Sequence, residues 1–172
     1  MEYDYAYLCE NLGHLSGLPV RMYKGDVLTH CYTNLSFEPD PANLVLDKIW
    51  KSNYSVSYHD ILNLVFVGAI RVAKDDITIV VGPTSQLQLD EMQLTACLRQ
   101  LGETGKRLPE LVGYFQSVPP YPLENFLHIL CFVNYALNDE KLTVRDLIGQ
   151  ETSYLRLSLE TPQREASNAP AE

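Results

Sequence analysis

The sequence predicts an α+β protein, with an antiparallel sheet of about five strands flanked by helices. Strand patterns are grouped along the chain, and helix patterns stand before, between and after them. The clearest group is "NLVFVGAIRVAKDDITIVVGP", residues 63–83, in which two apolar strands fold about an Asp75-Asp76 turn and the second ends at Gly82-Pro83. Strands that follow one another through short turns pair antiparallel, and helices must then cover the faces of the sheet.

The first elements are a helix and a hairpin. Residues 4–17 place apolar side chains at helical spacing, with Asp4 as the N-cap and Gly17 as the end of the helix. Residues 18–35 then alternate apolar and polar side chains on both sides of Lys24-Gly25-Asp26. This pattern predicts two short strands joined by a tight turn.

A second helix and an extended region come next. Residues 40–52 predict a helix in which Asp40 is the N-cap and Pro41 is the first helical residue. Residues 54–58 alternate Tyr, Ser and Val, which is typical of a strand. Residues 64–72 are nearly all apolar, so we expect a strand that is covered on both faces or has one poorly solvated face.

The remainder of the chain is helical by pattern. We expect helices within residues 87–103, 107–118 and 121–140, and a short capped turn over residues 143–150 that begins at Thr143. In the first of them the apolar side chains at helical spacing are Leu87, Met92, Cys97, Leu98 and Leu101.

One sensory or ligand-binding domain, residues 1–150, accounts for these elements, and residues 151–172 are expected to be a polar linker or tail.

The formal charge of −9 repels phosphate backbones, so we expect the chain to bind no nucleic acid by itself. No apolar run is long enough to span a membrane, and the acidic, aromatic N-terminus is unlike a secretory signal. We therefore expect a cytoplasmic protein that has no contact with membranes.

Residues with reactive side chains form no recognisable catalytic motif. Glycine-rich phosphate loops, nucleophile elbows and metalloprotease motifs are missing from the sequence. The pairs Glu10–His14 and Glu124–His128 have i, i+4 spacing, which is more typical of solvated helix contacts than of metal ligands. We expect no enzyme, no metal site and no cofactor. The cysteines have no metal-ligand spacing and are expected to be buried free thiols; they are Cys9, Cys31, Cys97 and Cys131.

Aromatic and cationic side chains on the predicted sheet and on helix 40–52 suggest a ligand site. The chain has 11 Tyr against 5 Phe and 1 Trp, and tyrosine suits a partly wet pocket or an interface. Tyr32, Trp50, Tyr58 and Arg71 are the candidate pocket-lining residues. Arg71 lies within an apolar strand, where a guanidinium needs an anion or a solvated face; the alternative is an ordinary strand residue that points to solvent.

Three stretches together resemble a GAF/PAS-like sensory module found at the N-terminus of some Firmicute AraC-type transcriptional regulators. They are "YLCENLGHLSGLPVRMYKGDVL", "VGAIRVAKDDITIVVGPTSQLQL" and "YPLENFLHILCFVNYALNDEKLTVRDLI". The resemblance extends from about Tyr3 to Ile148.

This resemblance implies an input domain that senses a small molecule or dimerises, placed ahead of a DNA-binding domain with two helix-turn-helix motifs. Nothing after Ile148 resembles such a domain, so either the sequence is a piece of a longer regulator or the protein acts without DNA contact. We expect an unidentified small-molecule ligand and a homodimer, with the sheet as the floor of a pocket and helix 40–52, together with the loop before it, as its lid. The alternative is a dimerisation module with no small-molecule ligand.

Overall fold

The computed structural model of the chain describes residues 2–33, 40–62 and 65–150. A 3-10 turn over Ala73–Asp75 joins the fourth and fifth strands, and a further helix covers residues 144–150. The other elements, in chain order, are α1 (Tyr5–Ser16), β1 (Val20–Lys24), β2 (Val27–Tyr32), α2 (Asn43–Lys51), β3 (Val56–Ile61), β4 (Val65–Val72), β5 (Ile77–Ser85), α3 (Glu91–Gln100), α4 (Arg107–Gln116) and α5 (Leu123–Asn138).

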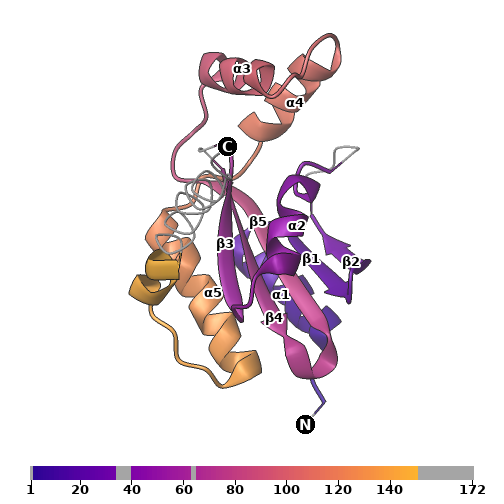
Figure 1. Cartoon of the computed structure of the whole chain (residues 1–172), viewed down its shortest axis with the longest axis vertical. Coiled ribbons are helices and arrows are strands. Elements are labelled where there is room, and N and C mark those ends of the chain that lie inside the picture. Colours follow the sequence, from indigo (N-terminus) through magenta and orange to yellow (C-terminus); the bar gives the residue numbers. More distant parts are fainter. Residues whose placement is uncertain (1, 34–39, 63–64, 151–172) are drawn as a thin grey trace, which may run out of the picture.

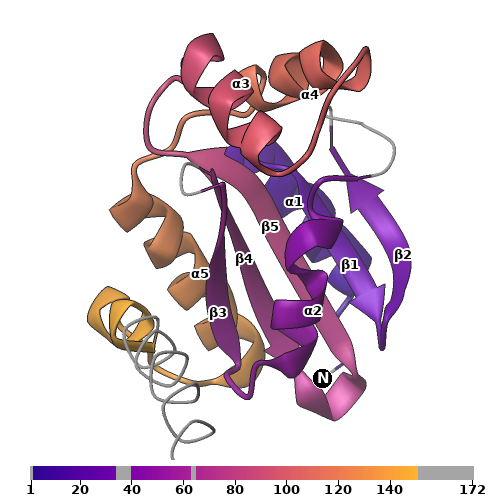
Figure 2. The same cartoon turned by 45° about the horizontal axis from the view of Figure 1, so that its top comes forward.

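The five strands form one antiparallel sheet in the order β2-β1-β5-β4-β3. Helices α1 and α5 cover one face, α2 covers the other, and the α3–α4 pair stands at one end of the sheet (Figures 1 and 2). The predicted α+β class with an antiparallel sheet flanked by helices is therefore confirmed. The predicted order of helix, hairpin, helix, three strands and helices is confirmed as well.

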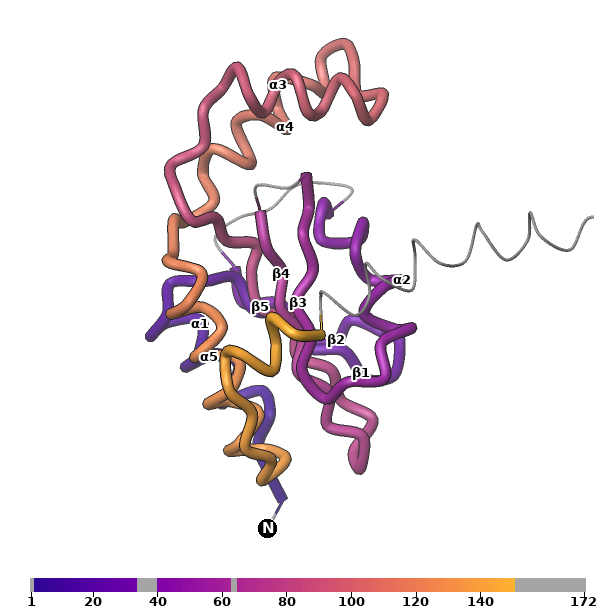
Figure 3. Tube along the Cα trace, turned by 60° about the vertical axis from the view of Figure 1, so that its left-hand side comes forward, coloured from indigo at the N-terminus to yellow at the C-terminus, as the bar shows by residue number. Residues whose placement is uncertain are grey.

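Strand alternation divides the core into two layers, one on each face of the sheet. On β4, Gly68 and Ile70 face α5, whereas Val67 and Ala69 face α2. Figure 3 shows the α1 and α5 layer on one side of the strands and α2 on the other. Because both faces of β4 are covered, a nearly continuous apolar run was the correct signal for this strand.

Local capping explains where several helices begin and end. The carboxylate of Asp4 accepts from the Tyr7 amide, and Gly17 ends α1 with a φ of 71°, a conformation that favours glycine. Asp90 caps α3 by accepting from two backbone amides. At the last helix, the Asp146 amide donates to the Thr143 hydroxyl at 3.2 Å, which confirms the predicted cap.

The predicted start of the second helix was wrong by two residues. Helix α2 begins at Asn43, and Pro41 and Ala42 lie in a turn before it. The carboxylate of Asp40 does accept from a backbone amide, that of Ala42 at 3.0 Å, but its main partner is Arg21 on the sheet. Asp40 is thus held by a long-range ion pair, which a local helix pattern cannot reveal. Strand β5 likewise continues past Gly82-Pro83 to Ser85.

The apolar stripe predicted for the helix after β5 was partly wrong. Leu87 and Met92 are 76% and 81% exposed, and the side chains buried from α3 are Leu94 and Leu98. Since α3 begins only at Glu91, Leu87 lies in the preceding loop. Helix α3 packs one narrow face against α4, which leaves Met92 in solvent and Cys97 half-buried.

The four cysteines are free thiols, as predicted, but not all of them are buried. Cys9 and Cys131 are buried, Cys97 is intermediate and Cys31 is exposed. Cys31 is exposed because β2 is an edge strand on which most side chains are accessible. Within the described residues, no helix is both long enough and apolar enough to cross a lipid bilayer. The predicted polar tail, residues 151–172, lies outside the described residues.

Candidate functional site

The four candidate ligand residues do not share one site. Trp50 belongs to α2, and strand alternation places Arg71 on the same face of the sheet as α2. Tyr32 and Tyr58 pack with the core under α1 and α5, on the other face. Trp50 and Arg71 border a hollow of about 350 Å³, together with Gly25, Asp26, Ala73, Asp76 and Thr78. Whether any of the four contacts a ligand stays a prediction.

Arg71 already has acceptors for its guanidinium. Its Nη1 donates to the Ser52 carbonyl at 2.7 Å, and its Nη2 donates to the carbonyls of Ile49 and Trp50 at 2.7 and 3.3 Å. These are the carbonyls at the C-terminal end of α2, where helices leave backbone acceptors unpaired and favour a cation. Arg71 therefore fixes the end of α2 to β4, which explains a cation within an apolar strand without a bound anion.

The space between α2 and the sheet, where the pocket was expected, is occupied by side chains of both. Val45 and Ile49 of α2 are each only 2% exposed, and they belong to the same apolar cluster as Val67 and Ala69 of β4 and Val80 of β5. Apolar packing of this kind positions α2 on the sheet.

A buried ion pair lies at the other end of this face. The Arg21 side chain is 1% exposed, and its Nε and Nη2 donate to the two carboxylate oxygens of Asp40 at 2.8 and 3.1 Å. Its Nη1 donates to the Gly82 carbonyl at 2.7 Å. Burial lowers and the Asp40 carboxylate raises the pKa of Arg21, and the carboxylate prevails. This pair joins the segment before α2 to the centre of the sheet.

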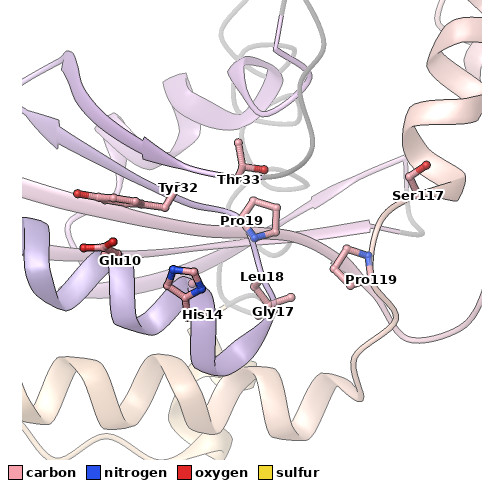
Figure 4. A pocket seen from close by; sticks show the side chains of 10 residues that line it. Glu10, His14, Gly17, Leu18, Pro19, Tyr32, Thr33, Ser117 and Pro119 are labelled. Carbon is pink, nitrogen blue, oxygen red and sulfur yellow. The ribbon is translucent and has the colours of Figure 1, made fainter.

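A pocket of about 500 Å³ opens on the opposite face, between α1, the end of β2 and the connection from α4 to α5 (Figure 4). Its volume is within the ~300–1,000 Å³ range of small-molecule sites. We call it the α1 pocket. Its lining residues are Glu10, Gly13, His14, Gly17, Leu18, Pro19, Tyr32, Thr33, Ser117 and Pro119.

Gly17 and the close approach of α1 to the strands shape this pocket. Gly17 ends α1 with a positive φ, and the chain turns there into β1. At Gly13 an added Cβ would lie 3.7 Å from the Tyr32 Cβ and 3.6 Å from the Leu18 carbonyl oxygen, so α1 already runs in close contact with the strands. The pocket lies beyond this contact, where His14 and Pro119 face the same opening (Figure 4).

The electrostatic character of the α1 pocket is negative. Among the described residues that line it, Glu10 is the only carboxylate and none is Lys or Arg. Partial burial, then the nearby charge of Glu10, raises the pKa of Tyr32, so its phenol is protonated at neutral pH. The Tyr32 ring also stacks on His30, with centroids 6.2 Å apart and an interplanar angle of 6°. These groups can bind and orient a ligand through hydrogen bonds and ring contacts.

Nucleophilic chemistry has little support in the geometry. Burial raises the pKa of the Cys9 thiol to about 12, so this thiol is not ionised at neutral pH. Among the residues that the structure describes, no group of three or more His, Cys, Asp or Glu side chains is arranged to hold a metal ion.

Sequence reasoning identified Tyr32 but missed most of the α1 pocket. The Glu10–His14 spacing was interpreted as a solvated contact; both residues are indeed exposed, and they also line the pocket. Arg21 was missed although its signal is the same as that of Arg71, a cation between apolar strand residues in "PVRMY". Ser117 and Pro119 carry no signal, because only the tertiary structure brings their connection next to α1.

His59 on β3 predicts a pH dependence of stability. Burial, and secondly the nearby charge of Lys48, lowers the pKa of His59 to about 4 from its ordinary 6.5. As the pH falls below 6.5, His59 binds a proton in the unfolded chain, but in the folded chain it binds one only near pH 4. The free energy of unfolding therefore decreases as the pH falls across this interval. We expect His59→Gln to remove about 1–2 kcal/mol of that loss, after allowance for solvent screening.

Chemical denaturation of both proteins between pH 7 and pH 4 measures this difference. His128→Gln is the matched control, because the His128 side chain is 64% exposed and contacts only Glu124 at 3.9 Å among the ion pairs of the described residues. Parallel pH profiles for wild type and His59→Gln would contradict the prediction.

The chain was compared with protein-family models, with curated proteins and with solved structures, and none of them matches.

Proposed function

We propose that the chain is a ligand-sensing and dimerising input domain of an AraC-type transcriptional regulator, as its sequence resemblance implies. The observation that supports sensing is the α1 pocket, whose lining comes from three segments that are distant in sequence. A ligand there would contact Glu10 and His14 on α1 and, at the same time, the residues that lead into α5. The formal charge of −9 is consistent with DNA contact by another part of the regulator.

Signal output would use the first and last long helices. Helices α1 and α5 share one apolar cluster on the same face of the sheet, and the Tyr3 hydroxyl donates to the Ala136 carbonyl at 3.1 Å. A ligand that binds better to one arrangement of these two helices shifts the population towards it. The C-terminal end of α5 would pass this shift to the following residues.

A thermal-shift screen against small metabolites tests the sensing function. A ligand that is present at 100 times its dissociation constant should stabilise the fold by about 2.7 kcal/mol, which raises the melting temperature by a few degrees. We expect His14→Trp, which fills the α1 pocket, to abolish the shift.

The matched control is His128→Trp, which adds the same ring to an exposed position of α5 outside the pocket, and it should preserve the shift. A screen without any stabilising compound, or a shift that His14→Trp leaves intact, would contradict the proposal.

Exposed apolar residues on the outer helices favour the second candidate function, a dimerisation module with no small-molecule ligand. On α5, Phe132 is 73% exposed and Tyr135 is 46% exposed, one turn apart on the outer side of the helix. Tyr7 of α1 is 66% exposed. Aromatic side chains of this kind are enriched in the cores of protein interfaces.

We expect Phe132→Glu to weaken the affinity of dimerisation at least tenfold, because it puts a charge into the apolar interface. The fraction of dimer at a given concentration then falls. Light scattering across a concentration series measures this change. Met92→Glu is the control, since Met92 is 81% exposed on α3, away from α5. Equal dimer fractions for wild type and Phe132→Glu would exclude α5 as the interface, and a dimer without any bound ligand would favour this second function.

A further inference from the structure

The backbone of the α1 pocket has few hydrogen-bond donors to offer. The Gly17 amide donates to the Gly13 carbonyl at 2.9 Å, and the Leu18 amide donates to the Ser16 hydroxyl at 3.1 Å. Pro19 and Pro119, which also line the pocket, have no amide hydrogen. Along residues 17–19 and at Pro119, the lining backbone therefore has no amide hydrogen left to bind an anion.

Two polar side chains of the pocket, Ser117 and Glu10, offer acceptors to a ligand. The Ser117 amide and hydroxyl both donate to the Gly113 carbonyl, at 3.2 and 2.9 Å, so the hydroxyl oxygen is left as an acceptor. The Glu10 carboxylate accepts only, when ionised. Since no described lining residue is Lys or Arg, a ligand carboxylate or phosphate would find no permanent positive charge among them.

An aromatic ring lies beside the carboxylate. Figure 4 shows Glu10 and Tyr32 on the same side of the pocket, with His14 next to them. The nearby charge of Glu10 also acts on the Tyr32 phenol. A carboxylate combined with an aromatic face is the arrangement that attracts an organic cation, through a charge-assisted hydrogen bond and a cation–π contact.

We propose that the α1 pocket binds a small organic ammonium compound, with Glu10 as its counterion, Tyr32 as its ring contact and the Ser117 oxygen as a further acceptor. This inference rests on the proposed sensing function and names the class of ligand. The formal charge of −9 draws cations towards the surface and disfavours anions at the same pocket.

Three compounds of the same shape and different charge test the ligand class. Benzylammonium, benzyl alcohol and benzoate are titrated separately into the full chain at physiological salt, which screens the overall charge of the protein beyond about 8 Å. Amide NMR spectra report the site and the affinity. We expect benzylammonium to bind best and to shift signals of residues 10–18, 32–33 and 117.

Two carboxylate variants provide the matched comparison. Glu10→Gln removes the proposed counterion and should weaken the binding affinity for benzylammonium at least ~10-fold, because a hydrogen bond to a charged group is lost. Glu124→Gln changes the carboxylate of the other Glu–His pair at i, i+4, on α5 and outside the pocket, and it should leave the affinity unchanged. Ser117→Arg brings a cation into the lining and should abolish binding of benzylammonium.

The outcomes separate the ligand class from the sensing function. The inference is overturned if benzoate or benzyl alcohol binds the pocket as tightly as benzylammonium, if Glu10→Gln has no effect, or if millimolar benzylammonium shifts no pocket signal. A neutral or anionic metabolite that shifts the melting temperature of wild type but not of His14→Trp would then leave the sensing function intact. Failure of every compound in the metabolite screen would overturn both.

Discussion

Asp40→Asn is expected to destabilise the protein by about 3–5 kcal/mol, because it leaves a buried guanidinium without its counterion. The Arg21 side chain is 1% exposed, whereas that of Asp40 is 25% exposed. Removal of the carboxylate therefore costs more than removal of the cation, since a lone Asp40 can still reach water. Urea denaturation followed by circular dichroism measures both changes.

The double variant Arg21→Met/Asp40→Asn makes this prediction specific to the pair. Since neither charge then remains buried alone, its loss should be smaller than the sum of the two single losses. Glu103→Gln is the matched control, because it breaks the exposed pair of Glu103 with Arg107, joined at 3.1 Å, and should cost less than about 1 kcal/mol. If Asp40→Asn costs no more than this control, the buried pair does not stabilise the fold.

Gly68→Ala is the second substitution with a large expected effect. A Cβ at Gly68 would lie 2.5 and 2.7 Å from the two Cδ atoms of Leu130 and 3.0 Å from the Cζ of Phe126. Both α5 side chains are fully buried, so they have little space into which to move. We expect a loss of about 1–3 kcal/mol from overpacking, with a larger loss for Gly68→Val, measured by thermal and urea denaturation.

Gly113→Ala is the control for this substitution. Nothing lies within 4 Å of a Cβ at Gly113, which is exposed on α4, so alanine should stabilise that helix by about 0.5–1 kcal/mol. Leu130→Ala should in turn relieve part of the loss caused by Gly68→Ala, because it removes both atoms in conflict. Equal stability of Gly68→Ala and wild type would show that α5 does not lie as close to β4 as the structure has it.

Strand and helix assignment succeeded where the signal was local. Two or three adjacent residues are enough to specify the turn at Asp75-Asp76 and the end of α1 at Gly17. Both were predicted correctly. The start of α2 failed for the opposite reason. Asp40 and Pro41 have the local pattern of a helix start, but a partner 19 residues away, Arg21, decides how Asp40 is used.

The candidate site shows the same division between local and long-range information. Tyr32 was identified from side-chain chemistry alone, and it does line the α1 pocket. Its grouping with Trp50 was wrong, because the two lie on opposite faces of the sheet. Which face a strand residue occupies depends on the register of the strand, and a shift by one residue reverses it.

The sequence by itself determined the order of the elements, the antiparallel sheet and the acidic surface, because capping residues, the period of apolar side chains and net charge are properties of short segments or of the whole composition. Tertiary structure alone decided that Arg71 binds the end of α2, that Arg21 pairs with Asp40, and that Ser117 lies in the same pocket as Glu10. Each of these arrangements brings together residues at least 19 positions apart, and each depends on burial and geometry that arise only when the two layers pack on the sheet.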